Sequence, residues 1–84
     1  MEVSAELSLY PLGTDDLGGP IRTFVLKMEG RGMELSVGPM SSTTVGSLDG
    51  VFDAIKIAFA AVAEERPCVL VAKISNACPV KPEK

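Results

Sequence analysis

The chain has 84 residues, a formal net charge of −3 and 46% hydrophobic residues. This length predicts a single domain, residues 1–84, with a small hydrophobic core. The mild acidity argues against a nucleic-acid partner, which would require a basic surface. No apolar run reaches the roughly 20 residues that span a membrane, and the first residues lack the features of a signal peptide. We therefore expect a cytoplasmic protein with no nucleic-acid partner and no membrane partner.

The side-chain chemistry argues against catalysis and metal binding. The sequence contains no histidine, which is the commonest general base and the commonest transition-metal ligand. Cys68 and Cys78 lie ten positions apart, whereas paired zinc ligands usually lie about two to four residues apart. We expect reduced thiols, no metal, no cofactor and no enzymatic activity.

Hydrophobic alternation predicts four β-strands. Residues 3–10 (VSAELSLY) alternate without interruption between apolar and polar side chains, as a strand with one buried face does. Residues 33–37 and 43–45 are predicted as a second and a third strand, paired as a hairpin. Residues 68–75 (CVLVAKIS) are predicted as the fourth strand, and its first half is apolar enough to indicate burial on both faces.

Two amphipathic helices are predicted between these strands. Pro20 suits the first turn of one helix, and Gly30 and Gly32 end it. Ser47 is expected to cap the other helix, and Pro67 blocks its continuation. Apolar side chains at helical spacing define the stripes that should be buried: Ile21, Phe24, Val25 and Met28 in the first helix, and Phe52, Ile55, Phe59 and Val62, backed by Val51 and Ala58, in the second.

The resulting order β-α-β-β-α-β predicts a ferredoxin-like α+β sandwich, with a four-stranded antiparallel sheet and both helices on one face. The first strand would lie centrally, between the third and the fourth, and residues 77–84 would form a short tail. The uncovered face would carry polar side chains from two strands: Glu6, Ser8, Tyr10, Lys73 and Ser75. Glu6 would be the only acid on that face of the central strand.

Three segments carry a family resemblance: AELSLYPL (residues 5–12), GPMSSTTVG (residues 38–46) and KISNACP (residues 73–79). Together they resemble the YkoF-type family of thiamine- and hydroxymethylpyrimidine-binding proteins, and the third segment matches without a gap. The hairpin segment departs from the family's Gly-Met-Ser-Thr pattern, because Pro39 intervenes and MSST replaces MST. Ser47 stands where the family has an acid.

The resemblance implies non-catalytic binding of thiamine or its hydroxymethylpyrimidine precursor in the cytoplasm, in support of thiamine uptake or salvage. It also implies a homodimer or higher oligomer, because YkoF proper resembles two such domains in tandem. The candidate ligand-binding residues come from three segments: Glu6, Ser8 and Tyr10 in the first strand, Met40, Ser41, Ser42 and Thr43 in the hairpin, and Lys73, Ser75 and Asn76 at the end of the fourth strand.

Several of these candidates also have a purely structural explanation. Glu6 would face the thiazolium cation or accept from the pyrimidine amine, or it would pair with Lys73 across the strands. The hairpin hydroxyls would bond ring nitrogens or form a turn, and Asn76 would contact ligand or serve as a left-handed (αL) or capping residue. The hairpin and residues 73–79 are expected at opposite ends of the sheet. The alternative function is a homo-oligomeric assembly module whose polar sheet face is only a subunit interface.

Overall fold

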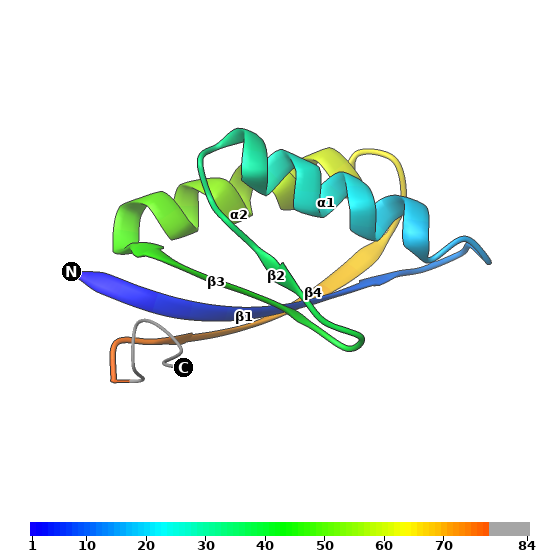
Figure 1. Cartoon of the computed structure of the whole chain (residues 1–84). Helices are drawn as coiled ribbons and strands as arrows, with labels where there is room; N and C mark the ends of the chain where they lie inside the picture. The colour runs from blue at the N-terminus through cyan, green and yellow to red at the C-terminus, as the bar shows by residue number, and fades with distance from the viewer. Residues whose placement is uncertain (78–84) are drawn as a thin grey trace.

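Four strands and two helices follow one another along the chain in the predicted ferredoxin-like order (Figure 1). The structure, a computed structural model, describes residues 1–77, so nearly all of the predicted tail lies outside the described residues. The elements are β1 (Glu2–Pro11), α1 (Gly18–Gly30), β2 (Ser36–Val37), β3 (Ser42–Ser47), α2 (Leu48–Ala63) and β4 (Cys68–Ser75). Within residues 1–77, no helix is both long and apolar enough to cross a membrane.

The strands form one antiparallel sheet in the order β2-β3-β1-β4, which confirms the central position predicted for the first strand. The pairing of β1 with β3 ends at Leu7 and Ser42, whereas its pairing with β4 continues to Pro11 and Cys68. From Ser8 onward, β1 therefore has a strand neighbour on one side only.

Both helices pack on the same face of the sheet, and the core lies between the two layers (Figure 1). Alternate residues of β1 supply one side of this core, and each helix adds a buried stripe. The buried apolar side chains are Val3, Ala5, Leu7 and Leu9 from β1, Phe24 and Met28 from α1, and Val51, Ala54, Ala58 and Val62 from α2. Burying a side chain of the size of valine or leucine contributes roughly 1.5–3 kcal/mol, so this face dominates the stability of the fold.

Both helix starts follow from local sequence. Pro20 lies in the first turn of α1, where its missing N–H is not needed, and the Asp16 carboxylate accepts the Gly19 N–H at 3.0 Å. The Ser47 hydroxyl accepts the Gly50 N–H at 3.0 Å, which confirms the predicted cap of α2.

The predicted apolar stripe of α2 is wrong at Phe52, which is half exposed. Ala54 is fully buried in its place, in a stripe that also contains Val51, Ala58 and Val62. The distance between packed elements depends on the side chains at their contact, and the two alanines allow α2 to approach its neighbours closely. The rest of the predicted stripe does pack on the core, since Val62 is buried and Ile55 and Phe59 are partly buried against it.

The predicted second strand, residues 33–37, is wrong in its first three positions, because only Ser36–Val37 pairs with β3. Side-chain contacts, and not backbone pairing with β3, fix the position of residues 33–35. The Thr44 hydroxyl donates to the Glu34 carbonyl at 2.7 Å, and Met33 packs against the hydrophobic core. A side-chain hydrogen bond thus replaces strand pairing in this segment.

The two strands beside β1 also differ from their predictions. β3 extends beyond the predicted residues 43–45 at both ends. β4 has the predicted bounds, but the prediction that its first half is buried on both faces is wrong, since Val69 and Val71 are 47% and 46% exposed. The helices cover only the opposite face, and β4 lies at the edge of the sheet. An apolar strip is therefore left on the open side.

Candidate ligand-binding site

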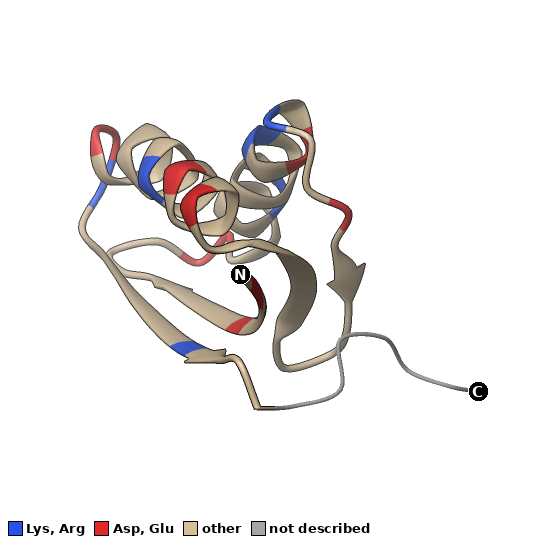
Figure 2. Ribbon diagram, turned by 90° about the vertical axis from the view of Figure 1, so that its left-hand side faces the viewer, with Lys and Arg blue, Asp and Glu red and all other residues tan. Residues whose placement is uncertain are grey.

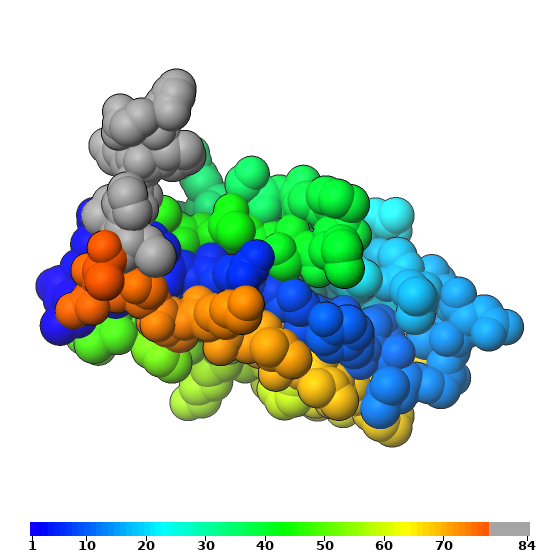
Figure 3. Space-filling model, turned by 90° about the horizontal axis from the view of Figure 1, so that it is seen from below, coloured from blue at the N-terminus to red at the C-terminus, as the bar shows by residue number. Residues whose placement is uncertain are grey.

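A row of polar side chains crosses three strands on the face of the sheet that the helices leave open. In this row, Glu6 of β1 lies opposite Thr43 of β3 and Lys73 of β4. The neighbouring residues Ala5 and Leu7 point into the core, so Glu6 points to the open face. Figure 3 looks onto this face, where β1 (blue) runs between β3 (green) and β4 (orange). Three of the predicted site residues are thus brought together, and with Ser41 we call them the polar row.

A side chain of the hairpin holds the Glu6 carboxylate. Glu6 Oε2 accepts a hydrogen bond from the Ser41 hydroxyl at 2.9 Å, and Glu6 Oε1 lies 3.7 Å from Lys73 Nζ. The alternative pairing of Glu6 with Lys73 is therefore present, but ion pairs between side chains that are 45% and 78% exposed are weak, typically about 0–1 kcal/mol. The bond from Ser41 orients the carboxylate and leaves lone pairs that a ligand can use.

An apolar strip borders the polar row toward the end of β1. It consists of Tyr10, Val69 and Val71, all roughly half exposed, and Tyr10 lies directly opposite Val69. Ser8 lies opposite Val71, and its hydroxyl donates a long hydrogen bond of 3.4 Å to the Met40 carbonyl in the hairpin. A flat ring lying on the apolar strip would therefore direct its polar edge toward the polar row.

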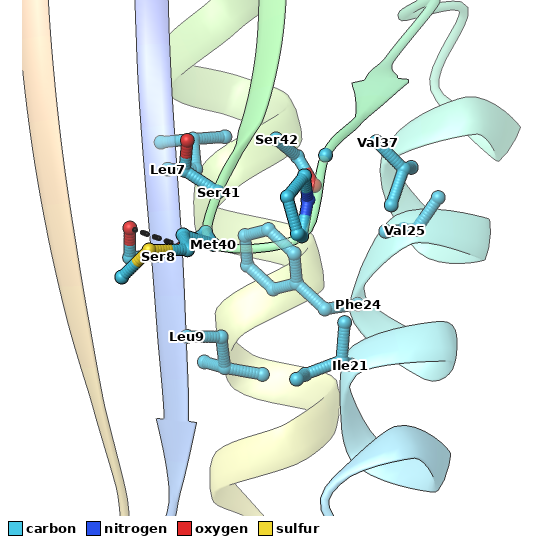
Figure 4. Close-up of a pocket in the computed structure, with 12 residues that line it drawn as sticks. Leu7, Ser8, Leu9, Ile21, Phe24, Val25, Val37, Met40, Ser41 and Ser42 are labelled. Atoms are coloured by element: carbon cyan, nitrogen blue, oxygen red, sulfur yellow. Dashed lines mark hydrogen bonds between the residues drawn. The ribbon is translucent and has the colours of Figure 1, made fainter.

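Ser42 lies on the opposite face of the sheet from Ser41 and Thr43. It pairs with Leu7, is buried, and lines a cavity of about 80 Å³ between the hairpin and α1, where Phe24 forms part of the wall (Figure 4). Ordinary small-molecule pockets measure about 300–1,000 Å³, so this cavity is too small for a whole thiamine molecule. The hairpin hydroxyls are therefore divided between two faces.

The end of β4 lies away from the hairpin, as expected. Ser75 lies opposite Ser4, and its hydroxyl accepts the Ala77 N–H at 2.9 Å, a bond typical of turns. Asn76 is exposed directly beyond the strand, and the last two residues of the KISNACP segment lie outside the described residues. Within the described part of this segment, only Lys73 reaches the polar row.

Residues 2–81 match the sequence profile of the YkoF-related family. The chain belongs to the YkoF-related family. The match extends from β1 through β4, so the polar row and the apolar strip of this YkoF-related domain both lie within it. No curated protein matches the chain by sequence.

Solved structures share the fold of this YkoF-related domain. A hypothetical protein from Methanocaldococcus jannascii superimposes with a TM-score of 0.85 at 21% identity, covering 95% of this chain and 87% of that chain. A candidate thiamine biosynthesis/salvage protein from Thermotoga maritima gives 0.77 at 23% identity, with coverages of 88% and 82%. A protein from Streptococcus pneumoniae gives 0.82 at 21% identity, with coverages of 89% and 86%. At these identities, the likeness shows the fold alone.

Two further polar residues of the YkoF-related chain lie on the open face. β1 begins at Glu2, so the prediction that Glu6 is the only acid on this face of the strand is wrong. The alternation of residues 3–10 extends back to Glu2, which is the signal that identifies it, but four residues of strand separate the two acids by about 13 Å. The alternation of residues 3–10 also places Ser4 on this face, and its hydroxyl is buried without a hydrogen-bond partner among the described residues. Within residues 1–77, no three acidic or cysteine side chains form a group that could hold a metal ion.

Proposed function

We propose that this chain binds thiamine or its hydroxymethylpyrimidine precursor without catalysis, in the cytoplasm and in support of thiamine uptake or salvage. The observation that carries the proposal is the Glu6 carboxylate, which accepts the Ser41 hydroxyl at 2.9 Å on the open face of the sheet. Membership of the YkoF-related family supports it, as does the likeness to the Thermotoga maritima protein, a candidate for thiamine biosynthesis or salvage.

The open face offers the two kinds of contact that an aminopyrimidine requires. The ring would lie on Tyr10 and Val71 of the apolar strip, and its exocyclic amine would donate to the Glu6 carboxylate. The Ser8 hydroxyl, opposite Val71, and the Thr43 hydroxyl, opposite Glu6, lie on the same face and would bond the ring nitrogens.

A carboxylate also suits thiamine itself, because the thiazolium ring carries a permanent positive charge. The Lys73 ammonium lies 3.7 Å from Glu6 and would repel that ring. Because the Lys73 side chain is 78% exposed, its ammonium can turn to solvent while its methylene groups remain over the ligand. Lys73 would then contact the ligand through its apolar stem.

A second copy of the chain would cover the other side of the ligand. One sheet face contacts a flat molecule from one side, whereas small-molecule sites usually bury about 70–90% of the ligand surface. A homodimer formed through the open faces would enclose the ligand and bury Val69 and Val71 at the same time. Ser75 and Asn76, at the far end of the sheet, would then contact the ligand held by the partner subunit.

A second candidate function is an assembly module whose open face is only a subunit interface. The exposed apolar strip favours it, because half-exposed valines on an edge strand are typical of surfaces that associate. Substitution of Glu6 separates the two functions: a binder loses ligand affinity and keeps its oligomeric state, whereas an assembly module changes its oligomeric state.

Isothermal titration of the purified chain with thiamine and with hydroxymethylpyrimidine tests the proposal. About 18 heavy atoms at roughly 0.3–0.5 kcal/mol each predict a Kd for thiamine between sub-millimolar and sub-micromolar values. Oxythiamine, in which an oxygen replaces the pyrimidine amine, is the matched control and should bind more weakly than thiamine. Absence of heat with thiamine and with hydroxymethylpyrimidine at about 1 mM, for protein with a folded circular dichroism spectrum, would contradict the proposal.

A further inference from the structure

A groove runs between the two helices on the side away from the sheet. Phe24 and Met28 of α1 are buried toward the sheet, whereas Leu26 and Lys27 are exposed on the other side. Two hollows lie along this outer side, one of about 610 Å³ and one of about 320 Å³, and Thr23 lines both. We call the two hollows together the helix groove.

The wider hollow combines an apolar surface with basic side chains. Leu26 and Ile57 line it and are 58% and 39% exposed. Lys27 and Arg31 also line it, and none of the described residues lining it is acidic. Arg31 pairs with Asp53 at 2.8 Å, whereas Lys27 has no ion pair within 4.0 Å among residues 1–77. Lys27 therefore presents an uncompensated positive charge beside an exposed leucine.

The basic residues of the chain gather at the helix groove. Of the eight Lys and Arg residues, Lys81 and Lys84 lie outside the described residues. Four of the others line the groove: Arg22, Lys27, Arg31 and Arg66. Figure 2 shows the basic residues in blue, with most of them in the helix layer. Asp16 and Glu65 line the narrower hollow and Asp53 pairs with Arg31, so the excess of positive charge in the groove lies in the wider hollow, at Lys27.

We propose that the helix groove docks an amphipathic helix of another protein, with apolar side chains against Leu26 and Ile57 and with carboxylates facing Lys27 and Arg22. The 13 residues of α1 give the groove a length of about 20 Å at about 1.5 Å per residue, which three to four turns of helix would fill. Helices that dock in grooves commonly use apolar anchors at i, i+3 or i+4, and i+7. The groove lies on the opposite side of the molecule from the polar row, so the proposal does not rest on ligand binding.

Charge and shape favour this occupant over two others. A membrane surface requires apolar side chains that protrude, whereas Leu26 and Ile57 border a hollow. A second copy docked by two-fold symmetry would bring Lys27 and its equivalent in the partner to the same interface, where like charges repel.

A synthetic peptide tests the proposal with the full chain. The probe is a fluorescein-labelled helical peptide of about 14 residues, with Leu at i, i+4 and i+7 and with Glu and Ala elsewhere. We expect a saturable increase in fluorescence anisotropy at protein concentrations on the order of 100 µM, as for a weak interface. The signal should fall when the salt concentration is raised, and a peptide with Lys in place of Glu should give no saturable signal.

Matched variants assign the binding to the helix groove. Leu26→Ser and Lys27→Glu should each weaken binding of the acidic peptide about tenfold. The control variants Leu12→Ser and Lys56→Glu make the same changes at exposed positions that do not line the groove, and should change affinity less than about twofold. Circular dichroism verifies the fold of each variant. The proposal would be overturned if the acidic peptide showed no saturable binding or if the basic peptide bound equally well. It would also be overturned if the control variants weakened binding as much as the groove variants, or if the chain bound anionic vesicles and not the acidic peptide.

Discussion

The two faces of β1 differ in what covers them. Val3, Ala5 and Leu7 are buried beneath the helices, whereas Glu6 is half-buried and Tyr10 half exposed on the side that the helices leave free. Both sets of side chains come from one strand of alternating sequence, so the odd-numbered residues face the helices and the even-numbered residues face the open side. Stability should therefore depend on one face and association with ligand or partner on the other, and single substitutions can separate the two.

The largest effect is expected on the covered face. Leu7→Ala removes a buried side chain and leaves a cavity, which should lower the free energy of unfolding by about 2–5 kcal/mol. Urea unfolding followed by circular dichroism measures the change. Val71→Ala, on the open face of the neighbouring strand, is the control and should lower the free energy by less than about 1 kcal/mol at dilutions where the chain is monomeric. Equal losses of unfolding free energy in the two variants would contradict the proposed difference between the two faces.

A smaller effect is expected on self-association. Val71→Lys places a charge in the apolar strip, where a homodimer would bury it, and should raise the Kd for dimerisation by about tenfold or more. Sedimentation equilibrium measures this Kd. Leu17→Lys makes a similar change at an exposed leucine outside the strip and should leave the Kd unchanged. A stable monomer in the unsubstituted chain at tens of micromolar would contradict the proposed dimer.

Ligand affinity should respond to the single carboxylate of the polar row. Glu6→Gln keeps the size of the side chain and removes its charge, so thiamine should bind about tenfold more weakly and the neutral pyrimidine less than about threefold more weakly. Isothermal titration with both compounds gives the comparison. Glu2→Gln alters an acid of the same strand and face outside the row, and should have no effect. Equal losses for both compounds would exclude a role for the charge.

The smallest effect on thiamine affinity is expected at Lys73, where the substitution should strengthen binding rather than weaken it. Lys73→Met keeps most of the apolar stem and removes the ammonium that lies 3.7 Å from Glu6, so thiamine should bind about twofold to threefold more tightly. Titration calorimetry at two salt concentrations tests this, because the gain should shrink as salt screens the charge. Lys56→Met on α2 is the control and should leave the affinity for thiamine unchanged. Weaker binding in the Lys73 variant would mean that the ammonium itself contacts the ligand.

Local rules were sufficient for the order of the elements, because each depends on a short stretch of sequence. The alternation of residues 3–10 identified β1, and the hydroxyl of Ser47 identified the start of α2. Phe52 was misplaced because a helix buries the side that packs most closely, and the alanines of α2 define that side. Val69 and Val71 were misplaced because an apolar run does not show whether its second face is packed, and β4 lies at the edge of the sheet with that face open.

The candidate site depended on contacts between distant residues. Glu6 and Ser41 are 35 positions apart, and their hydrogen bond requires the register between β1 and β3. That register places Thr43 beside Glu6 and turns Ser42 toward the core, a division that the run of hydroxyls does not reveal. The identities of the polar residues could be predicted from the sequence, whereas their grouping required the fold.

Ser47 is both the last residue of β3 and the cap of α2, so no linker separates the strand from the helix. One inserted residue at this junction would turn the helix by about 100° and shift it by about 1.5 Å, which would carry Val51 away from the core. Residues 12–17, 31–35, 38–41 and 64–67 lie outside strands and helices and can absorb changes of length. We therefore expect insertions and deletions to be tolerated in these segments, while the junction after β3 must keep a constant length.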